Sequence, residues 1–454
     1  MSTAAITPDR SGGRRATSGG AVHRAFWRWH FYAGLLVMPW LMLMALTGGL
    51  YLFQPEIEAA VRRPLLTVEA SNARTDPQAW ADAAVRAAPG RLVQVLTPAT
   101  PTASAQLVTE SADGVRRTVY VNPHDGRVLG VGGDGELLDW VVKLHSLDFG
   151  WPVLNGLIEV VAGWAIVMVA TGVVLWWPRE GTGGVVTVRG SPRSRVFWRD
   201  LHAVTGVVAG ALIVFLAVTG MPWSAVWGST VRDVTNDLGW GRPRPPAGAA
   251  AWSRAGHAGH GAAPWSLQTT TLPAHAGHGP VSLDAVVATA DAAGLPRPYR
   301  LTAPAEPGRA WVAAHMPAQV ENTRTLYLDG EDGRLLADVG YGQFGPAAKA
   351  LEWGVAVHQG RQYGAVNRWL MLSACVSIWV LGVTGLVMWW RRKPSGRLAA
   401  PPPPADRAAY LPLAAVVGPL AVIYPLVGAS LLIVLALDVT AGRLLRRPTS
   451  EPTA

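Results

Sequence analysis

The chain has 454 residues, of which 50% are hydrophobic and only 15% are charged, a balance typical of membrane proteins. The net charge is +9 at pH 7, but the basic residues cluster beside apolar runs, which indicates membrane topology and argues against a nucleic-acid partner. The single cysteine, Cys375, lies inside an apolar run, so a disulfide framework and a thiolate metal site are both excluded.

Four apolar stretches reach or approach the ~20 residues that cross a bilayer core. They cover residues 31–53, 153–177, 203–223 and 369–390. The first follows an Arg-bearing N-terminus, as a signal peptide would, but it is too long and lacks a small-residue cleavage site, so we interpret it as a retained anchor. A fifth stretch, 410–438, contains Pro419 and Pro425 and reads either as a span or as a hydrophobic hairpin.

The distribution of charge predicts which segments face the cytoplasm. Segments 1–29, 178–199 and 391–409 together carry fifteen Lys or Arg and three acidic residues, which places them inside by the positive-inside rule. The large inserts at 55–140 and 224–350 have no basic excess, so we expect them outside. The N-terminus is then cytoplasmic in a multi-pass protein of the inner membrane, surrounded by lipid.

The predicted fold is a bundle of four core membrane helices plus a C-terminal hydrophobic segment, with two small outer α+β domains. The predicted segments follow one another in chain order: N-terminus 1–29, first span 30–54, first outer domain 55–140, second span with its outer approach 141–178, inner loop 179–199, third span 200–223, second outer domain 224–350 with a His-rich loop at 254–279, fourth span with its outer approach 351–391, linker 392–409, fifth segment 410–438 and tail 439–454.

The two outer inserts repeat one another. Thr118–Leu129 matches Thr325–Leu336, and in each segment alternating apolar residues flank an Asp-Gly turn. This pattern predicts a β-hairpin with one buried face. The matching segments indicate an internal two-fold repeat of the chain.

The repeat extends to four histidines near the ends of the spans. His30 and His202 each precede a Thr-Gly pair by seventeen residues, and His145 and His358 each precede a Trp-Trp pair by thirty-one. The predicted topology puts His30 and His202 at the inner start of outward-running helices. It puts His145 and His358 outside, before inward-running helices, with a helix break expected near Gly150. The histidines therefore form two pairs, one at each face of the membrane.

Two imidazoles from facing helices can hold the iron of a haem on both sides. Ionisable side chains at membrane depth are costly, which favours a functional role for these histidines. The cofactor predicted at His30, His202, His145 and His358 is therefore non-covalent haem, with two copies expected. The alternative is that each histidine is only a polar residue at the membrane boundary.

The insert at 224–350 also contains His257, His260, His275 and His278 in a Gly-rich loop. Four imidazoles suit copper, zinc or iron. Glycine beside each histidine gives no preorganisation, so the loop could equally be solvated and bind no metal.

The Trp29-His30 and Leu201-His202 pairs, the Thr-Gly pairs and the two Asp-Gly hairpins resemble the PepSY-associated transmembrane family, which includes iron-regulated membrane proteins and ferric-siderophore reductases. The resemblance implies b-type haems in the bundle and PepSY domains outside. It implies an enzyme that reduces a ferric siderophore or another metal chelate externally, with a quinol or a cytoplasmic reductase as the electron donor. Two alternatives remain: a non-enzymatic PepSY membrane regulator, and a copper-handling reductase or sensor that uses the His-rich loop.

Overall fold

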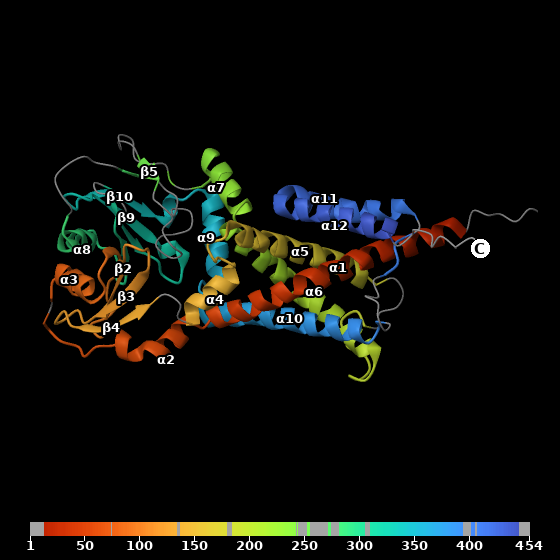
Figure 1. Cartoon of the computed structure of the whole chain (residues 1–454), viewed down its shortest axis with the longest axis horizontal. Helices are drawn as coiled ribbons and strands as arrows, with labels where there is room; N and C mark the ends of the chain where they lie inside the picture. The colour runs from red at the N-terminus through yellow and green to blue at the C-terminus, as the bar shows by residue number, and fades with distance from the viewer. Residues whose placement is uncertain are drawn as a thin grey trace, which may run out of the picture. The chain divides into compact units, whose positions relative to one another are not determined.

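The computed structural model describes residues 13–73, 75–133, 137–178, 184–241, 243, 252–254, 271–273, 281–304, 309–393, 401–404 and 406–444. The chain forms two compact units, which are described separately (Figure 1). The helical unit comprises Met1–Gly48, Leu144–Ser229 and Leu372–Ala454, and the sheet unit comprises Gly49–Lys143 and Thr230–Met371.

The long helices are α1 (Gly13–Tyr51), α5 (Pro152–Trp176), α6 (Arg195–Gly220) and α10 (Gly364–Trp390). Within the described part of the chain, these four helices are long and apolar enough to cross a membrane, which agrees with the four predicted spans and with a multi-pass membrane protein. Helices α1 and α6 begin eight or more residues before the predicted apolar stretches. His30 therefore lies well inside α1 and His202 lies in the third turn of α6, because the polar residues before each histidine continue the helix.

The fifth apolar stretch forms two helices, α11 (Leu411–Ile423) and α12 (Pro425–Leu444). Tyr424 between them has an extended backbone, and Pro425 begins the second helix because proline suits a first helical position. The two helices pack against each other and against α5 (Figure 1). A Cβ at Gly163 of α5 would lie 2.2 Å from Val427 Cγ2, so this close approach requires glycine. Of the two predicted alternatives, this geometry is that of the hairpin.

Shorter elements complete the repeat. The helices are α2 (Gln54–Leu66), α3 (Pro77–Ala87), α4 (Leu137–Ser146), α7 (Trp227–Asp237), α8 (Leu283–Ala292) and α9 (Pro346–His358). The main strands are β1 (Arg91–Leu96), β2 (Ala105–Glu110), β3 (Arg116–Val121), β4 (Val128–Gly133), β7 (Arg300–Thr302), β8 (Trp311–His315), β9 (Arg324–Leu328) and β10 (Leu335–Gly340), and β5 (Trp252–Arg254) pairs separately with β6 (Thr271–Pro273).

The sheet unit contains one antiparallel sheet of eight strands in the order β10-β9-β8-β7-β1-β2-β3-β4. The first repeat supplies β1 to β4 and the second supplies β7 to β10. Val95 of β1 pairs with Leu301 of β7 at the junction. The sequence predicted two small domains, whereas the structure joins them into one sheet. If the two domains were separate, β1 and β7 would each have an exposed edge. Their pairing protects both edges.

Both predicted hairpins are present, as β3–β4 and as β9–β10. Gly126 and Gly333 have φ values of 72° and 73°, in the left-handed region that glycine adopts readily. The preceding Asn122 and Asp329 each accept a backbone N–H two residues later through the side-chain oxygen. The two turns therefore use the same local chemistry.

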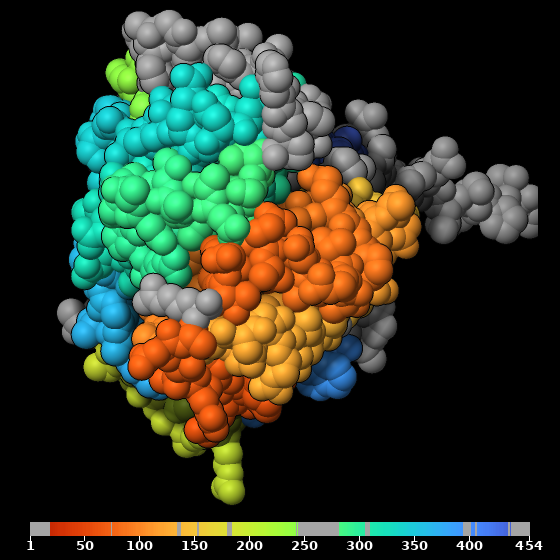
Figure 2. Space-filling view, turned by 90° about the vertical axis from the view of Figure 1, so that its left-hand side faces the viewer, coloured from red at the N-terminus to blue at the C-terminus, as the bar shows by residue number. Residues whose placement is uncertain are grey.

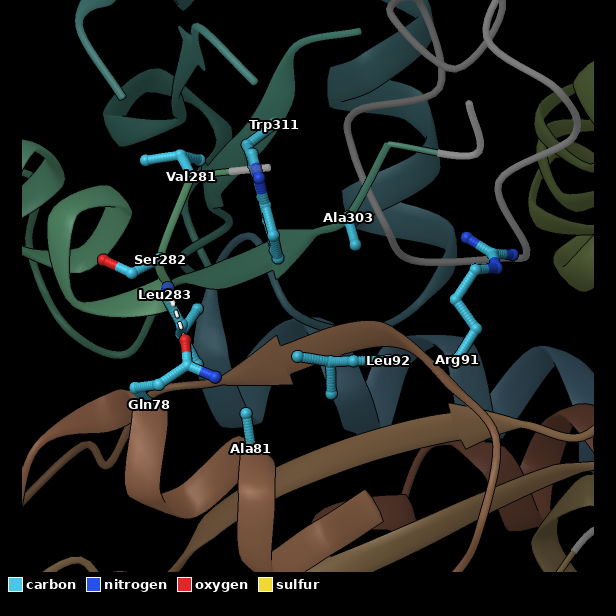
Figure 3. A pocket seen from close by; sticks show the side chains of 9 residues that line it. All are labelled: Gln78, Ala81, Arg91, Leu92, Val281, Ser282, Leu283, Ala303 and Trp311. Atoms are coloured by element: carbon cyan, nitrogen blue, oxygen red, sulfur yellow. Dashed lines mark hydrogen bonds between the residues drawn. The ribbon is translucent and has the colours of Figure 1, made fainter. Parts of the chain in front are cut away.

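Helices α3 and α8 lie next to each other where the two repeats meet (Figure 3). The side-chain oxygen of Gln78 accepts the Leu283 backbone N–H at 2.9 Å, and Asp284 accepts the Gln78 backbone N–H at 2.7 Å. A hollow of about 470 Å³ beside this seam is lined partly by Leu92 and Trp311. The two repeats also adjoin on the surface, as the orange and green regions of Figure 2 show.

Candidate functional site

The structure brings two of the predicted ligands together. His30 of α1 and His202 of α6 have ring centroids 6.3 Å apart and ring planes at 90°. They are separated by 172 positions in the sequence, so only the packing of the helical unit makes them neighbours. We call this arrangement the inner histidine pair.

Each ring of the inner histidine pair is held by a threonine from a different helix. His30 Nδ1 lies 3.0 Å from Thr171 Oγ1 on α5, and His202 Nδ1 lies 2.9 Å from Thr384 Oγ1 on α10. The Thr171 hydroxyl donates to the Val167 carbonyl at 2.7 Å, and the Thr384 hydroxyl donates to the Val380 carbonyl at 2.7 Å. Because each hydroxyl hydrogen is already committed, the imidazole Nδ1–H must be the donor to the threonine oxygen.

This assignment determines which nitrogen can bind a metal. A neutral imidazole with its proton on Nδ1 carries a free lone pair on Nε2. Each ring also makes a hydrogen bond to the backbone, His30 to Met168 and His202 to Leu381. The inner histidine pair therefore offers two lone pairs from two helices.

His145, the last residue but one of α4, is held in the same way. Its Nδ1 lies 3.1 Å from Thr47 Oγ1 and 3.0 Å from the Met44 carbonyl oxygen. A carbonyl can only accept, so Nδ1–H is again the donor. Burial lowers the pKa of His145, which favours the neutral ring that a metal requires.

Glycine follows each of these threonines and lies against the histidine ring. A Cβ at Gly48 would lie 2.9 Å from His145 Cε1, a Cβ at Gly172 would lie 3.2 Å from His30 Cε1, and a Cβ at Gly385 would lie 3.7 Å from His202 Cε1. The Thr-Gly pair therefore has two functions: threonine accepts the ring N–H, and glycine leaves room for the ring.

His358 is the last residue of α9 and belongs to the sheet unit, whereas His145 belongs to the helical unit. In both repeats the outer histidine lies at the end of a short helix that precedes a long one. The chain turns between α4 and α5 at Gly150, where φ is 78°. The pairing of His145 with His358 stays a prediction.

A haem fits the chemistry of the inner histidine pair. A metal held by one nitrogen of each ring, with bonds of ~2.0–2.1 Å, would require the two rings to lie close together. The observed centroid separation is 6.3 Å. The glycines beside the rings remove side-chain bulk where a flat macrocycle would have to pass between helices.

The other predicted metal site is the His-rich loop of the second outer insert. His257, His260, His275 and His278 all lie outside the described residues. Within the described part of the chain, no group of three or more His, Cys, Asp or Glu side chains is placed to hold a metal ion.

The Thr-Gly pairs were visible in the sequence as repeat features, but their contacts with the histidine rings were not predicted. Two asparagines were missed as well. Asn155 donates its amide to the carbonyl of Ser146, next to His145, at 3.4 Å, and Asn367 donates to the carbonyl of Val357, next to His358, at 2.9 Å. The sequence did contain a signal for these residues. An asparagine follows His145 by ten residues and His358 by nine, in each case in an apolar stretch.

No curated protein matches the chain. The sequence profile described as "PepSY-associated TM region" matches residues 27–392, which is most of the chain and includes the four predicted haem ligands His30, His145, His202 and His358. The matched region ends before α11 and α12 begin. The protein therefore belongs to the PepSY-associated transmembrane family.

Proposed function

We propose that this protein is a haem b-containing electron-transfer protein of the inner membrane, which reduces a ferric chelate such as a ferric siderophore on the extracytoplasmic side. The observation that supports this most directly is the inner histidine pair. Two imidazoles whose ring centroids are 6.3 Å apart, one from α1 and one from α6, form a ligand set for a metal.

The residues of the chain have distinct roles in this proposal. His30 and His202 hold the inner haem, Thr171 and Thr384 orient the two rings, and the surrounding apolar helices exclude water. When bound, haem b supplies a one-electron carrier. A haem held by both histidines would favour electron transfer over oxygen binding.

The same ligand chemistry is proposed for a second haem at His145 and His358. His145 shares the Thr-Gly environment of the inner residues, which supports an equivalent role. Along α1, Thr47 lies seventeen residues after His30, so the two levels are separated by ~25 Å of helix. Two carriers at these levels would divide the distance across the membrane.

The direction of transfer follows from topology and charge. The basic segments beside the spans assign the N-terminus to the cytoplasm and the sheet unit to the outside. A quinol or a cytoplasmic reductase would donate one electron at the inner level, and an external Fe(III) chelate would accept it. The Fe(II) product is held less tightly by hard oxygen ligands, so the iron is released.

The first test is the visible spectrum and the haem-to-protein ratio of the detergent-purified full chain. We expect a Soret band that shifts on reduction with dithionite and a ratio near two. Replacing His202 with Ala should remove about half of the haem, and the matched control is His315→Ala, because His315 lies on strand β8 in the sheet unit.

A preparation without haem, or a His202→Ala variant with the full haem content, would disprove the proposed inner site. A preparation without haem would favour the alternative of a non-enzymatic PepSY membrane regulator, in which the histidines are only structural. Copper binding that disappears on deletion of 254–279 would favour the copper-handling protein, because only that function needs the His-rich loop.

A further inference from the structure

We infer that Thr171 and Thr384 are positioning residues that fix the ligating tautomer of His30 and His202 and strengthen both rings as iron ligands. This inference rests on the proposed function, since it concerns haem at the inner histidine pair. The threonines would contact neither the haem nor an electron partner. They act through the histidine rings.

The direction of the hydrogen bonds carries the argument. A threonine hydroxyl has one hydrogen, and in Thr171 that hydrogen points to the Val167 carbonyl at 2.7 Å. The same arrangement holds at Thr384, which donates to the Val380 carbonyl at 2.7 Å. The lone pairs of both oxygens are therefore directed toward the imidazoles. Each ring also has a backbone acceptor, Met168 for His30 and Leu381 for His202, so the hydroxyl is one of two groups that favour the same tautomer. The opposite tautomer would place two lone pairs against each other.

The location of these bonds increases their effect. Thr171 is 0% exposed and Thr384 is 1% exposed, so water cannot replace the hydroxyl oxygen as the acceptor. A hydrogen bond from the second ring nitrogen raises the basicity of a metal-bound imidazole and fixes the ring orientation. A stronger imidazole donor stabilises ferric over ferrous iron, so these threonines should lower the reduction potential of the inner haem.

An independent example occurs elsewhere in the helical unit. Thr47 is 3% exposed, donates to the Leu43 carbonyl at 2.8 Å and lies 3.1 Å from His145 Nδ1. Three threonines on three helices thus share one geometry. A repeated geometry of this kind is difficult to explain by helix packing alone, because a valine would fill the same volume without a hydroxyl.

The experiment uses the purified full chain and compares Thr171→Val with Thr171→Ser, and Thr384→Val with Thr384→Ser. Valine keeps the volume and removes the hydroxyl acceptor, so that only the backbone acceptor at Met168 or Leu381 remains, whereas serine keeps the hydroxyl. The readouts are haem content, the reduction midpoint potential of the inner haem and the electron paramagnetic resonance spectrum of the ferric form. Thr235→Val is the matched control, since Thr235 makes the same bond to a carbonyl four residues back but, in the described structure, contacts no histidine.

We expect both valine variants to show a more positive midpoint potential and haem retention that is weaker by ~10–100-fold, with altered resonance of the ferric form. Both serine variants and Thr235→Val should resemble the unmodified protein. If valine removes the haem altogether, recovery with serine still supports the inference.

Two results would overturn the inference. One is a valine variant with normal haem content and an unchanged potential, and the other is loss of haem in the valine and serine variants alike, which would make the methyl group and not the hydroxyl responsible. Failure of the proposed function looks different, because the unmodified protein would then contain no haem or would retain it in full after His30→Ala.

Discussion

Gly48 of α1 lies directly against the imidazole of His145, and a Cβ at this glycine would be 2.9 Å from the ring Cε1. Real Cβ atoms essentially never approach another atom so closely, so an alanine here would have to displace the ring. The neighbouring Thr47 holds the same ring by a hydrogen bond, which leaves it little freedom to move. The position of His145 therefore depends on the absence of a side chain at residue 48.

Gly48→Ala should displace His145 and remove the haem predicted at the outer level. Gly385→Ala should have a smaller effect, since its Cβ would lie 3.7 Å from His202 Cε1, at ordinary van der Waals distance. The measurement is the haem-to-protein ratio of the purified variants. Gly34→Ala is the control, because a Cβ there meets nothing within 4 Å. Equal haem content in the Gly48 and Gly34 variants would contradict this prediction.

Asn367→Ala should destabilise the turn that follows His358. Asn367 is 3% exposed, donates its amide to the Val357 carbonyl and accepts the Tyr363 backbone N–H. Its removal takes away one of the hydrogen bonds of the Val357 carbonyl, which also accepts the Gly360 N–H, at a cost of ~0.5–1.5 kcal/mol. We expect a lower thermal unfolding temperature in detergent and a reduced occupancy of the outer haem. Asn322→Ala on the exposed surface should change neither, and a similar loss in both variants would refute the assigned role.

Glu159→Ala should loosen the C-terminal hairpin. Glu159 of α5 is 0% exposed and accepts the backbone N–H of Trp227 at 2.9 Å and of Leu426 at 3.2 Å. Its carboxylate thus caps the first turns of α7 and α12, where a negative group is stabilising. Limited proteolysis should cut the hairpin faster in Glu159→Ala than in the exposed-site control Glu69→Ala. The cleavage rate of Glu159→Gln, which keeps one acceptor oxygen, should lie between the rates of these two variants.

The hairpin also predicts the location of the C-terminus. Because the chain reverses at Tyr424, the end of α12 should lie on the same side of the membrane as the start of α11, which is the cytoplasmic side by charge. A fluorescent protein fused after Ala454 should therefore fluoresce, and alkaline phosphatase at the same position should be inactive. The reverse pair of results would mean that residues 410–438 cross the membrane once.

The sequence by itself determined the four spans, the internal repeat and the two Asp-Gly hairpins. Each of these depends on local physical chemistry: the length of an apolar run, the alternation of side chains along a strand, and the need for glycine at a left-handed turn position. Identical spacings in the two repeats also singled out His30, His145, His202 and His358 as equivalent positions. Local patterns suffice for such features because they concern residues close together in the chain.

Tertiary structure alone decided which segments meet. The contact of His30 with Thr171 spans 141 positions and that of His202 with Thr384 spans 182. The β1–β7 pairing that merges the two outer inserts joins strands about 200 positions apart. Hydropathy identifies an apolar helix face or a strand edge but not its neighbour, because the same apolar surface can be buried against many partners. The choice among them depends on shape and on the pairing of every buried polar group, which only the folded chain reveals.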